Sequence, residues 1–206
     1  MTLSEVQLDR LMQYLELLLQ WRRYLNLTGL REAERIIDVL VVESLDFLQG
    51  GLLPPTARLL DLGTGAGVPG VTLAICEPAL RLTLLDRSQK KMTFVRRVVS
   101  LLQLHNCCLD VASAQELALR LAPEERFEVV VARGVGSVTR VLCLAAPLLR
   151  PGGLLLLRKL PQTPELQEAA PLLTSGAWGH IRSVPLPPTA QSGWALFGIP
   201  RSGAAS

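Results

Sequence analysis

Residues 59–70 decide the fold: they read Leu-Leu-Asp-Leu-Gly-Thr-Gly-Ala-Gly-Val-Pro-Gly, an apolar run that contains a carboxylate and then turns through closely spaced glycines. Glycine adopts backbone angles that other residues avoid, and without a Cβ it lets main-chain N–H groups approach a ligand closely. A second apolar run, residues 82–85, ends at Asp86 one helix's length later. Nucleotide-binding α/β proteins place the carboxylate that binds the ribose hydroxyls at this point. The order of strand, glycine turn, helix, strand and acid therefore predicts a cofactor site.

The glycine pattern is compatible with two cofactors. Residues 65–70 satisfy the dinucleotide pattern G-x-G-x-x-G. A dinucleotide site, however, has its first glycine directly after the strand and its helix under way by the third, where this chain has Pro69. Asp61, two residues before Gly63, fits the acid-x-G-x-G-x-G loop of enzymes that use S-adenosylmethionine. We favour this cofactor, with a nicotinamide cofactor or a tight turn without a ligand as the alternatives.

Length and composition indicate one domain. A chain of 206 residues can bury a sizeable core as a single α/β domain. No apolar run approaches the ~18 residues of a membrane span, and the first residues lack the features of a signal peptide. The four cysteines show no C-x-x-C pairing and lie in apolar stretches, so we expect reduced core thiols, no metal site and a cytoplasmic location.

The chain divides into an N-terminal extension, a cofactor domain and a short tail. Residues 1–55 are predicted to be helical, because Ser4 and Gln7 form a capping-box pattern and apolar residues recur at helical spacing up to about residue 25. A second helix is predicted over residues 32–48. Residues 56–200 form the predicted S-adenosylmethionine-binding domain, and residues 201–206 are expected to be disordered.

Strands and helices alternate throughout the predicted cofactor domain. Strands are predicted over residues 58–62, 81–86, 107–112, 127–132, 154–158, 180–186 and 194–200, and helices near 70–76, 89–103, 114–121, 138–148 and 164–173. This alternation predicts a Rossmann-like α/β fold with a mostly parallel sheet and helices on both faces. A proline-rich loop without a helix joins the last two strands, so the prediction is seven strands with one antiparallel edge strand.

Basic residues gather in two places, although the net charge is only +3. The group in the extension consists of Arg22, Arg23, Arg31 and Arg35, and the group after Asp86 consists of Arg87, Lys90, Lys91, Arg96 and Arg97. Such groups can neutralise RNA phosphates. The alternative is a solvated helix surface.

Motifs over nearly the whole chain resemble the bacterial small-subunit ribosomal RNA guanine-N7 methyltransferase family, also called glucose-inhibited division protein B. The matching segments are Trp21-x4-Asn26-Leu27-Thr28, Glu43-Ser44-Leu45, residues 61–70, Leu85-Asp86, Glu116, Ala132-Arg133 and Lys159. The glycine loop is shared with many methyltransferases, whereas residues 26–28 and 67–70 are more particular. The resemblance implies a class I methyltransferase that methylates N7 of a guanine in 16S ribosomal RNA, either naked or in an assembling small-subunit particle.

Roles follow from position and from the resemblance. The main chain at Gly63, Thr64, Gly65 and Gly67 is expected beneath the methionine part of the cofactor, with Asp61 near its ammonium group and Asp86 accepting from the ribose hydroxyls. The resemblance places Gln115 and Glu116 at the adenine, although Glu116 could equally be a surface acid at a helix start.

Other candidate residues are polar groups near the ends of strands or in the extension. Arg133 and Lys159 follow apolar strands at the ligand edge of the sheet, where each could position cofactor or RNA. Arg133 could instead pair with Asp61 or Glu116, and Lys159 could extend to solvent. Asn26 and Thr28 could cap the second helix, or lie over the cofactor site as the resemblance implies.

The proposed chemistry needs no acid or base. Guanine N7 carries a lone pair and no proton, so it can attack a sulfonium methyl group directly. The two histidines, His105 and His180, lie in no motif. We therefore expect positioning to supply the acceleration.

The chain departs from the family pattern mainly at expected substrate contacts. A histidine before the acid and serine is replaced by Leu40, with Glu43 as the acid. The positions of a basic residue, a glycine and an Arg-His pair hold Ala114, Leu160 and Gly193-Trp194. A divergent substrate, or a module that binds RNA or protein without catalysis, stays open.

Overall fold

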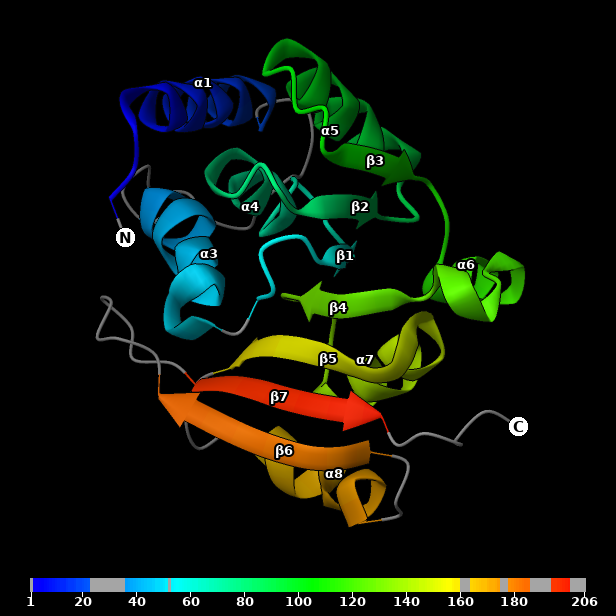
Figure 1. The fold of residues 1–206 in the computed structure, drawn as a ribbon. Coiled ribbons are helices and arrows are strands. Elements are labelled where there is room, and N and C mark those ends of the chain that lie inside the picture. The colour runs from blue at the N-terminus through cyan, green and yellow to red at the C-terminus, as the bar shows by residue number, and fades with distance from the viewer. Residues whose placement is uncertain are drawn as a thin grey trace.

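A seven-stranded sheet forms the centre of the protein (Figure 1). The computed structural model describes residues 2–22, 36–51, 53–159, 164–174, 178–185 and 194–200. The strands are β1 (Arg58–Leu62), β2 (Arg81–Leu85), β3 (Cys107–Asp110), β4 (Phe127–Ala132), β5 (Leu149–Lys159), β6 (Trp178–Pro185) and β7 (Trp194–Pro200), in the order β3-β2-β1-β4-β5-β7-β6. From β1 the sheet extends in one direction through β2 and β3, and in the other direction through β4 and β5. Open α/β sheets bind ligands at the point where the strand order changes direction in this way, here between β1 and β4.

The central strands are apolar because both of their faces are covered. Leu59 and Leu60 of β1 are fully buried, and so is Val130 of β4. Successive side chains of a strand point to opposite faces. Leu59 accordingly packs in one hydrophobic cluster, and Leu60 and Val130 pack in another on the opposite face. This is the composition of strands in a parallel sheet with helices on both sides.

Helices cover both faces of the sheet. On one face lie α1 (Glu5–Trp21), α4 (Gly70–Cys76) and α5 (Gln89–Leu101). On the other lie α6 (Ala114–Arg120), α7 (Val138–Ala145) and α8 (Pro164–Thr174). Ser88, Ser113 and Ser137 cap α5, α6 and α7 through their side-chain oxygens, so three helices begin just after strand-end loops.

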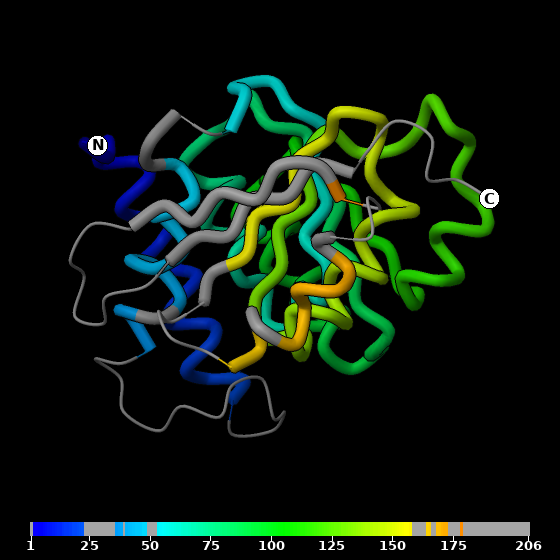
Figure 2. The backbone as a smooth tube through the Cα atoms, turned by 90° about the horizontal axis from the view of Figure 1, so that it is seen from below, coloured from blue at the N-terminus to red at the C-terminus, as the bar shows by residue number. Residues whose placement is uncertain are grey.

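The N-terminal extension belongs to the same core as the sheet. Leu11, Leu15 and Leu18 of α1 are buried, and Gln7 Nε2 donates to the carbonyl of Cys76 at 2.9 Å. Figure 2 shows the extension, in blue, on the opposite side of the sheet from the green segment around α6. The extension is therefore held by packing and not only by a linker.

The second helix of the extension is helical but irregular where it is described. It consists of the π-helical turn η1 (Asp38–Val42), α3 (Glu43–Leu45) and the 3-10 segment η2 (Asp46–Gly51). Ser44 Oγ and Thr72 Oγ1 both donate to the carbonyl of Leu40, at 2.6 and 3.0 Å. Such side-chain donors supply hydrogen bonds to carbonyl groups at irregular turns, where the regular backbone hydrogen bonds of an α-helix are interrupted.

One detail of the predicted sheet is corrected. Seven strands with one antiparallel are present, but the antiparallel strand β7 lies between β5 and β6, and β6 is the edge strand. The reason lies in the sequences: β7 is almost wholly apolar, whereas β6 contains His180, Arg182 and Ser183. An inner strand needs apolar residues more than an edge strand does.

The expectation that all cysteines lie in the core is also corrected. The four cysteines are free thiols, but Cys108 and Cys143 are exposed. Apolar neighbours in sequence do not bury a residue that points away from the core.

Among the described residues, no helix is both long and apolar enough to span a bilayer. The expected tail, residues 201–206, lies outside the described residues.

Candidate functional site

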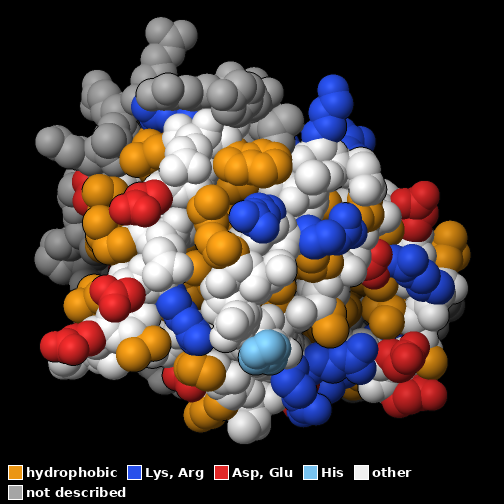
Figure 3. All heavy atoms as spheres, turned by 90° about the horizontal axis from the view of Figure 1, so that it is seen from above, with side chains coloured by type: hydrophobic (Ala, Val, Ile, Leu, Met, Phe, Trp, Pro, Cys, Tyr) orange, Lys and Arg blue, Asp and Glu red, His pale blue; other side chains and the backbone are white. Residues whose placement is uncertain are grey.

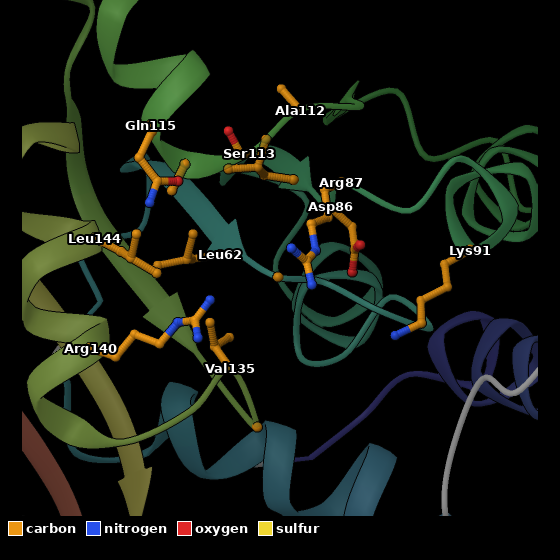
Figure 4. A pocket seen from close by; sticks show the side chains of 14 residues that line it. Leu62, Asp86, Arg87, Lys91, Ala112, Ser113, Gln115, Val135, Arg140 and Leu144 are labelled. Carbon is orange, nitrogen blue, oxygen red and sulfur yellow. The ribbon is translucent and has the colours of Figure 1, made fainter.

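A cavity of about 350 Å³ lies at the carboxyl ends of the first four strands (Figure 4). Its lining comes from the segments that follow β1, β2, β3 and β4 and from α7: Leu62, Gly63, Leu85, Asp86, Arg87, Lys91, Ala112, Ser113, Ala114, Gln115, Gly134, Val135, Arg140 and Leu144. Small-molecule sites in proteins have volumes of this order, about 300 to 1,000 Å³. Sequence analysis correctly placed the ligand end of the sheet here.

The glycine loop forms one wall of the cavity. Gly63 has φ +72°, and a Cβ there would lie 2.8 Å from Val135 Cγ2. Thr64 N donates to the carbonyl of Leu85 at 2.9 Å, which fastens the loop to the end of β2. Only glycine fits at position 63 without moving Val135 or straining the backbone. Gly63 therefore presents bare main chain to the cavity, whereas Thr64, Gly65 and Gly67 are not among its lining residues. Contact between this loop and a cofactor stays a prediction.

Asp61 holds the loop together from beneath. It is fully buried, and its Oδ2 accepts from Thr64 Oγ1 at 2.6 Å and from Gly70 N at 2.8 Å. Burial raises the pKa of Asp61 to about 7, the two hydrogen bonds and the more distant Arg133 opposing this effect. Oδ1 has no hydrogen-bond partner among the described residues. Contact between Asp61 and a ligand's ammonium group would need Oδ1 to become accessible, and it stays a prediction.

Asp86 directly follows β2 and lines the cavity. Its Oδ2 accepts from Gly65 N at 2.9 Å, and its Oδ1 accepts from Ser88 N at 2.8 Å. Each carboxylate oxygen can accept a further hydrogen bond. Asp86 thus orients the glycine loop and the start of α5 while keeping capacity for a ligand's hydroxyl groups. Its contact with ribose hydroxyls stays a prediction.

Tyr14 connects the extension to the glycine loop, a contact that sequence analysis missed. Its side chain is fully buried, and its hydroxyl donates to the carbonyl of Ala66 at 2.8 Å. Burial raises the pKa of Tyr14, and the carboxylate of Asp61 raises it further. Tyr14 lies on the apolar stripe of α1 with Leu11 and Leu18, so helical spacing could have identified its burial but not its partner.

Arg133 pairs with the extension. Its Nη2 donates to Glu43 Oε2 at 2.7 Å, and the two side chains are 21% and 7% exposed. The expected partners of Arg133, Asp61 or Glu116, were wrong, because no local pattern in the sequence links residue 133 to residue 43. Arg133 does not line the cavity in this structure. Contact with cofactor or RNA stays a prediction.

Gln115 and Glu116 have different positions. Gln115 lines the cavity. Glu116 is exposed outside it, and its Oε2 accepts from Ser113 N at 2.7 Å and from Ser113 Oγ at 2.8 Å in a capping box. These hydrogen bonds lower the pKa of Glu116. Glu116 thus has the surface role considered for it, and its contact with an adenine remains a prediction.

The predicted RNA-binding residues are only partly brought together. Trp21 near the end of α1 packs on Phe94 of α5, with ring centroids 5.7 Å apart, so Arg22 and α5 are neighbours. Lys91 lines the cavity, whereas Lys90 is exposed outside it. The view from above in Figure 3 shows Lys and Arg side chains in separate groups, not as one continuous patch.

Several predicted residues cannot be placed. Arg23, Asn26 and Thr28 lie outside the described residues, as do Leu160 and Gly193. The backbone of Lys159 pairs with Trp194 in the sheet, but its side chain is not described.

Two positions where the chain departs from the family pattern are visible. Leu40 is a core residue at 4% exposure, so the expected histidine position is filled by packing. Ala114 lines the cavity, where a longer basic residue was expected. Arg87, which was counted with the basic residues after Asp86, and Arg140, which was not singled out, line the same cavity. The periodicity of the sequence could not show this, because the loop after β2 that holds Arg87 and the helix α7 that holds Arg140 meet only in the folded sheet.

The sequence model of the GidB family, described as rRNA small subunit methyltransferase G, matches residues 7–176. The chain belongs to this family. The matched range runs from α1 to the end of α8, and it contains every described residue that lines the cavity. The GidB family assignment therefore covers both the extension and the cofactor domain.

Named relatives agree with this assignment. The chain is 40% identical over 169 residues to ribosomal RNA small subunit methyltransferase G of Psychrobacter sp. (strain PRwf-1), covering 80% of this chain and 72% of the relative. It is 38% identical over 176 residues to the protein of that name from Deinococcus radiodurans, covering 85% and 70%.

Solved structures show the same fold. The O-methyltransferase TomG from Streptomyces achromogenes, in complex with SAM, superimposes with a TM-score of 0.64 at 15% identity, covering 98% of this chain and 92% of TomG. Aeropyrum pernix fibrillarin with bound S-adenosyl-L-methionine gives a TM-score of 0.59 at 16% identity, covering 77% and 74%. These similarities show a Rossmann-like methyltransferase fold.

Proposed function

We propose that this protein transfers a methyl group from S-adenosylmethionine to N7 of a guanine in 16S ribosomal RNA, in the cytoplasm. Membership of the GidB family supports the reaction class and the RNA substrate. The observation that carries the proposal is the cavity bounded by the bare backbone at Gly63 and by Asp86. Both are placed by the loop after β1 and the end of β2, the two segments that the sequence pattern singled out.

The residues at this cavity fit S-adenosylmethionine. Gly63 exposes main chain, Asp86 keeps acceptor capacity for ribose hydroxyls, and apolar Leu62 and Leu144 offer surface for a purine ring. The carboxylate of Asp61 beneath the loop favours a positive charge above it. When bound, S-adenosylmethionine supplies an electrophilic methyl group on its sulfonium.

The lining residues are suited to positioning and not to proton transfer. Guanine N7 has a lone pair and no proton to lose, so its attack on a methyl group requires no general base. Among the described residues that line the cavity there is no histidine, and the one carboxylate, that of Asp86, already accepts two backbone N–H groups. Holding two reactants in line can lower a barrier by up to about 7–11 kcal/mol. We assign this role to the rigid loop and the residues around it.

The fixed loop explains how such positioning is achieved. Asp61, Asp86 and Tyr14 each hydrogen-bond a different part of residues 64–70. A loop fastened at several points loses little conformational freedom when a ligand binds. The N-terminal extension, through Tyr14, thereby contributes to the cofactor site without lining it.

Binding of S-adenosylhomocysteine, the demethylated product, tests the proposal. Asp86→Ala removes a charged acceptor of the ribose hydroxyls, and we expect the Kd measured by calorimetry to rise at least tenfold, the low end for one charge-assisted hydrogen bond. Asp110→Ala is the matched control, because Asp110 ends the neighbouring strand β3 but pairs with Arg120 outside the cavity. Equal Kd values for the wild type and Asp86→Ala would contradict the assignment.

A further inference from the structure

Three basic side chains line the cavity that holds Asp86. Arg87 follows β2, Lys91 lies in the first turn of α5, and Arg140 lies in the first turn of α7. Figure 4 shows Arg140 extending from α7 on one side of the cavity, while Arg87 and Lys91 lie on the other. The cavity therefore has cationic groups on two sides.

Among the described residues these three cations lack a carboxylate partner, unlike three arginines elsewhere in the protein. Arg120, Arg133 and Arg150 each form an ion pair, with Asp110, Glu43 and Glu128 respectively. Within the described ranges, no carboxylate lies within 4.0 Å of the charged groups of the three cavity cations. Asp86 is the one acid among the described residues that line the cavity. Three cations against one carboxylate give the cavity an excess of positive charge.

The local backbone directs Arg140 toward this place. Gly136, in the turn between β4 and α7, has φ +142°, and a Cβ there would lie 3.1 Å from Arg140 Cδ. The aliphatic stem of Arg140 thus passes over bare backbone. Because Gly136 has no side chain, the stem of Arg140 can follow this path, and Arg140 lines the cavity.

We infer that Arg140, together with Arg87 and Lys91, binds a backbone phosphate of the RNA strand next to the guanine that is methylated. This inference rests on the proposed function. A base that reacts inside a cavity must leave its stack, so the adjoining phosphates pass across the cavity mouth. Guanidinium and ammonium groups form charge-assisted hydrogen bonds with phosphate oxygens. Cations on two sides of the cavity can hold such a phosphate from two directions.

The charge of the cofactor argues against its carboxylate as the main ligand of these cations. S-adenosylmethionine has one carboxylate, one ammonium and one sulfonium, so its net charge is positive. Its binding would add to the positive charge of the cavity, whereas RNA phosphates neutralise it. An RNA phosphate would therefore neutralise positive charge in the cavity when S-adenosylmethionine is bound.

The test compares Arg140→Gln with Arg81→Gln. Arg81 is an exposed arginine at the opposite end of β2, outside the cavity, and serves as the matched control. RNA affinity is measured with transcribed 16S ribosomal RNA by filter binding between about 0.05 and 0.2 M salt. For Arg140→Gln we expect the Kd for RNA to rise roughly tenfold. We also expect the log–log salt slope to become shallower by about 0.7 to 0.9 for one lost phosphate contact.

Further readouts separate a phosphate contact from other roles. The Kd for S-adenosylhomocysteine without RNA should be unchanged in Arg140→Gln, and Arg140→Lys should recover part of the RNA affinity. Arg81→Gln should match the wild type throughout. An unchanged salt slope in Arg140→Gln overturns the inference. Weaker binding of S-adenosylhomocysteine by Arg140→Gln also overturns it, because that result would assign Arg140 to the cofactor's carboxylate. RNA binding is measured without turnover, so a wild type that binds but does not methylate contradicts the proposed function alone.

Discussion

Arg133 Nη2 donates to Glu43 Oε2 over 2.7 Å, joining the end of β4 to the helical segment of the N-terminal extension across 90 positions of sequence. Glu43 is almost fully buried and Arg133 is mostly buried. A charge left without its partner in such a place is costly, because it has lost water and gained no substitute. The pair therefore fixes the extension relative to the sheet.

Removal of either partner is expected to destabilise the protein. Glu43→Gln and Arg133→Gln should each lower the free energy of unfolding by about 1–3 kcal/mol, and the double variant should cost less than the sum. Arg150→Gln, which removes a more exposed pair with Glu128, should cost less than about 1 kcal/mol. Urea unfolding measures all four. Strict additivity of the two single changes would show that the pair has no coupling.

Asp61 predicts a specific dependence of stability on pH. Its pKa is raised by burial from 3.8 to about 7. A raised pKa in the folded state means that the stabilisation is fully present below the unfolded pKa, near 4, and is lost as the pH rises toward 7. Asp61→Asn lacks this titration. The stability of the wild type relative to Asp61→Asn should therefore fall between about pH 4 and 7 and then level off.

Urea unfolding of both proteins at several pH values provides the measurement. All other titrating groups are shared, so they cancel in the difference. Two stability curves that run parallel over this range would contradict the raised pKa of Asp61.

Gly70 is expected to tolerate no side chain. A Cβ there would lie 2.3 Å from Leu84 Cδ2 and 2.6 Å from Asp61 Oδ2. Gly70→Ala should therefore cost about 1–3 kcal/mol of stability through overpacking, and should disturb the Gly70 N–H bond to Asp61. Gly152→Ala is the control for backbone strain, because Gly152 has φ +75° but open space around it. It should cost about 1–2 kcal/mol and leave affinity for S-adenosylhomocysteine unchanged.

The ligand binding of these two variants separates the effects. Gly70→Ala should lower the affinity for S-adenosylhomocysteine as well as the stability of the fold, since Asp61 holds the loop after β1 in place. If Gly70→Ala bound S-adenosylhomocysteine as tightly as Gly152→Ala, Asp61 would not support the cofactor loop through Gly70.

Local sequence signals were sufficient for much of the fold. The strand, glycine loop, helix and Asp86 were predicted because each depends on neighbouring residues: apolar runs, positive φ angles and a strand end. The capping serines before α5, α6 and α7 likewise act within one turn.

Contacts between distant segments were beyond the sequence. Tyr14 meets Ala66 across 52 positions, and Arg133 meets Glu43 across 90. Only the packing of α1 and the second helix of the extension against the sheet brings them together. The same holds for Arg140, whose place at the cavity depends on how α7 returns along the sheet. The order of β6 and β7 was missed because a hairpin can add to a sheet by either strand.

Catalysis without a base predicts a flat pH profile. His105 is exposed and does not line the cavity. With saturating S-adenosylmethionine and RNA, single-turnover methylation should show no histidine-like ionisation between about pH 6 and 8. His105→Asn and His180→Asn should retain methylation rates within about twofold of the wild type. General acid–base catalysis, which raises the rates of other enzymes by about 10²–10⁴-fold, is not needed here. A large loss in either variant would indicate a base that the account lacks.

The most direct measurement compares 16S ribosomal RNA transcribed with guanosine and with 7-deazaguanosine, each incubated with the protein and methyl-labelled S-adenosylmethionine. The 7-deaza base keeps the Watson–Crick edge but has carbon in place of N7. Filter binding of both RNAs shows whether they bind equally, so that loss of methylation is not loss of association. The account predicts label in the guanosine RNA and none in the 7-deaza RNA. Equal label in both would contradict N7 as the acceptor.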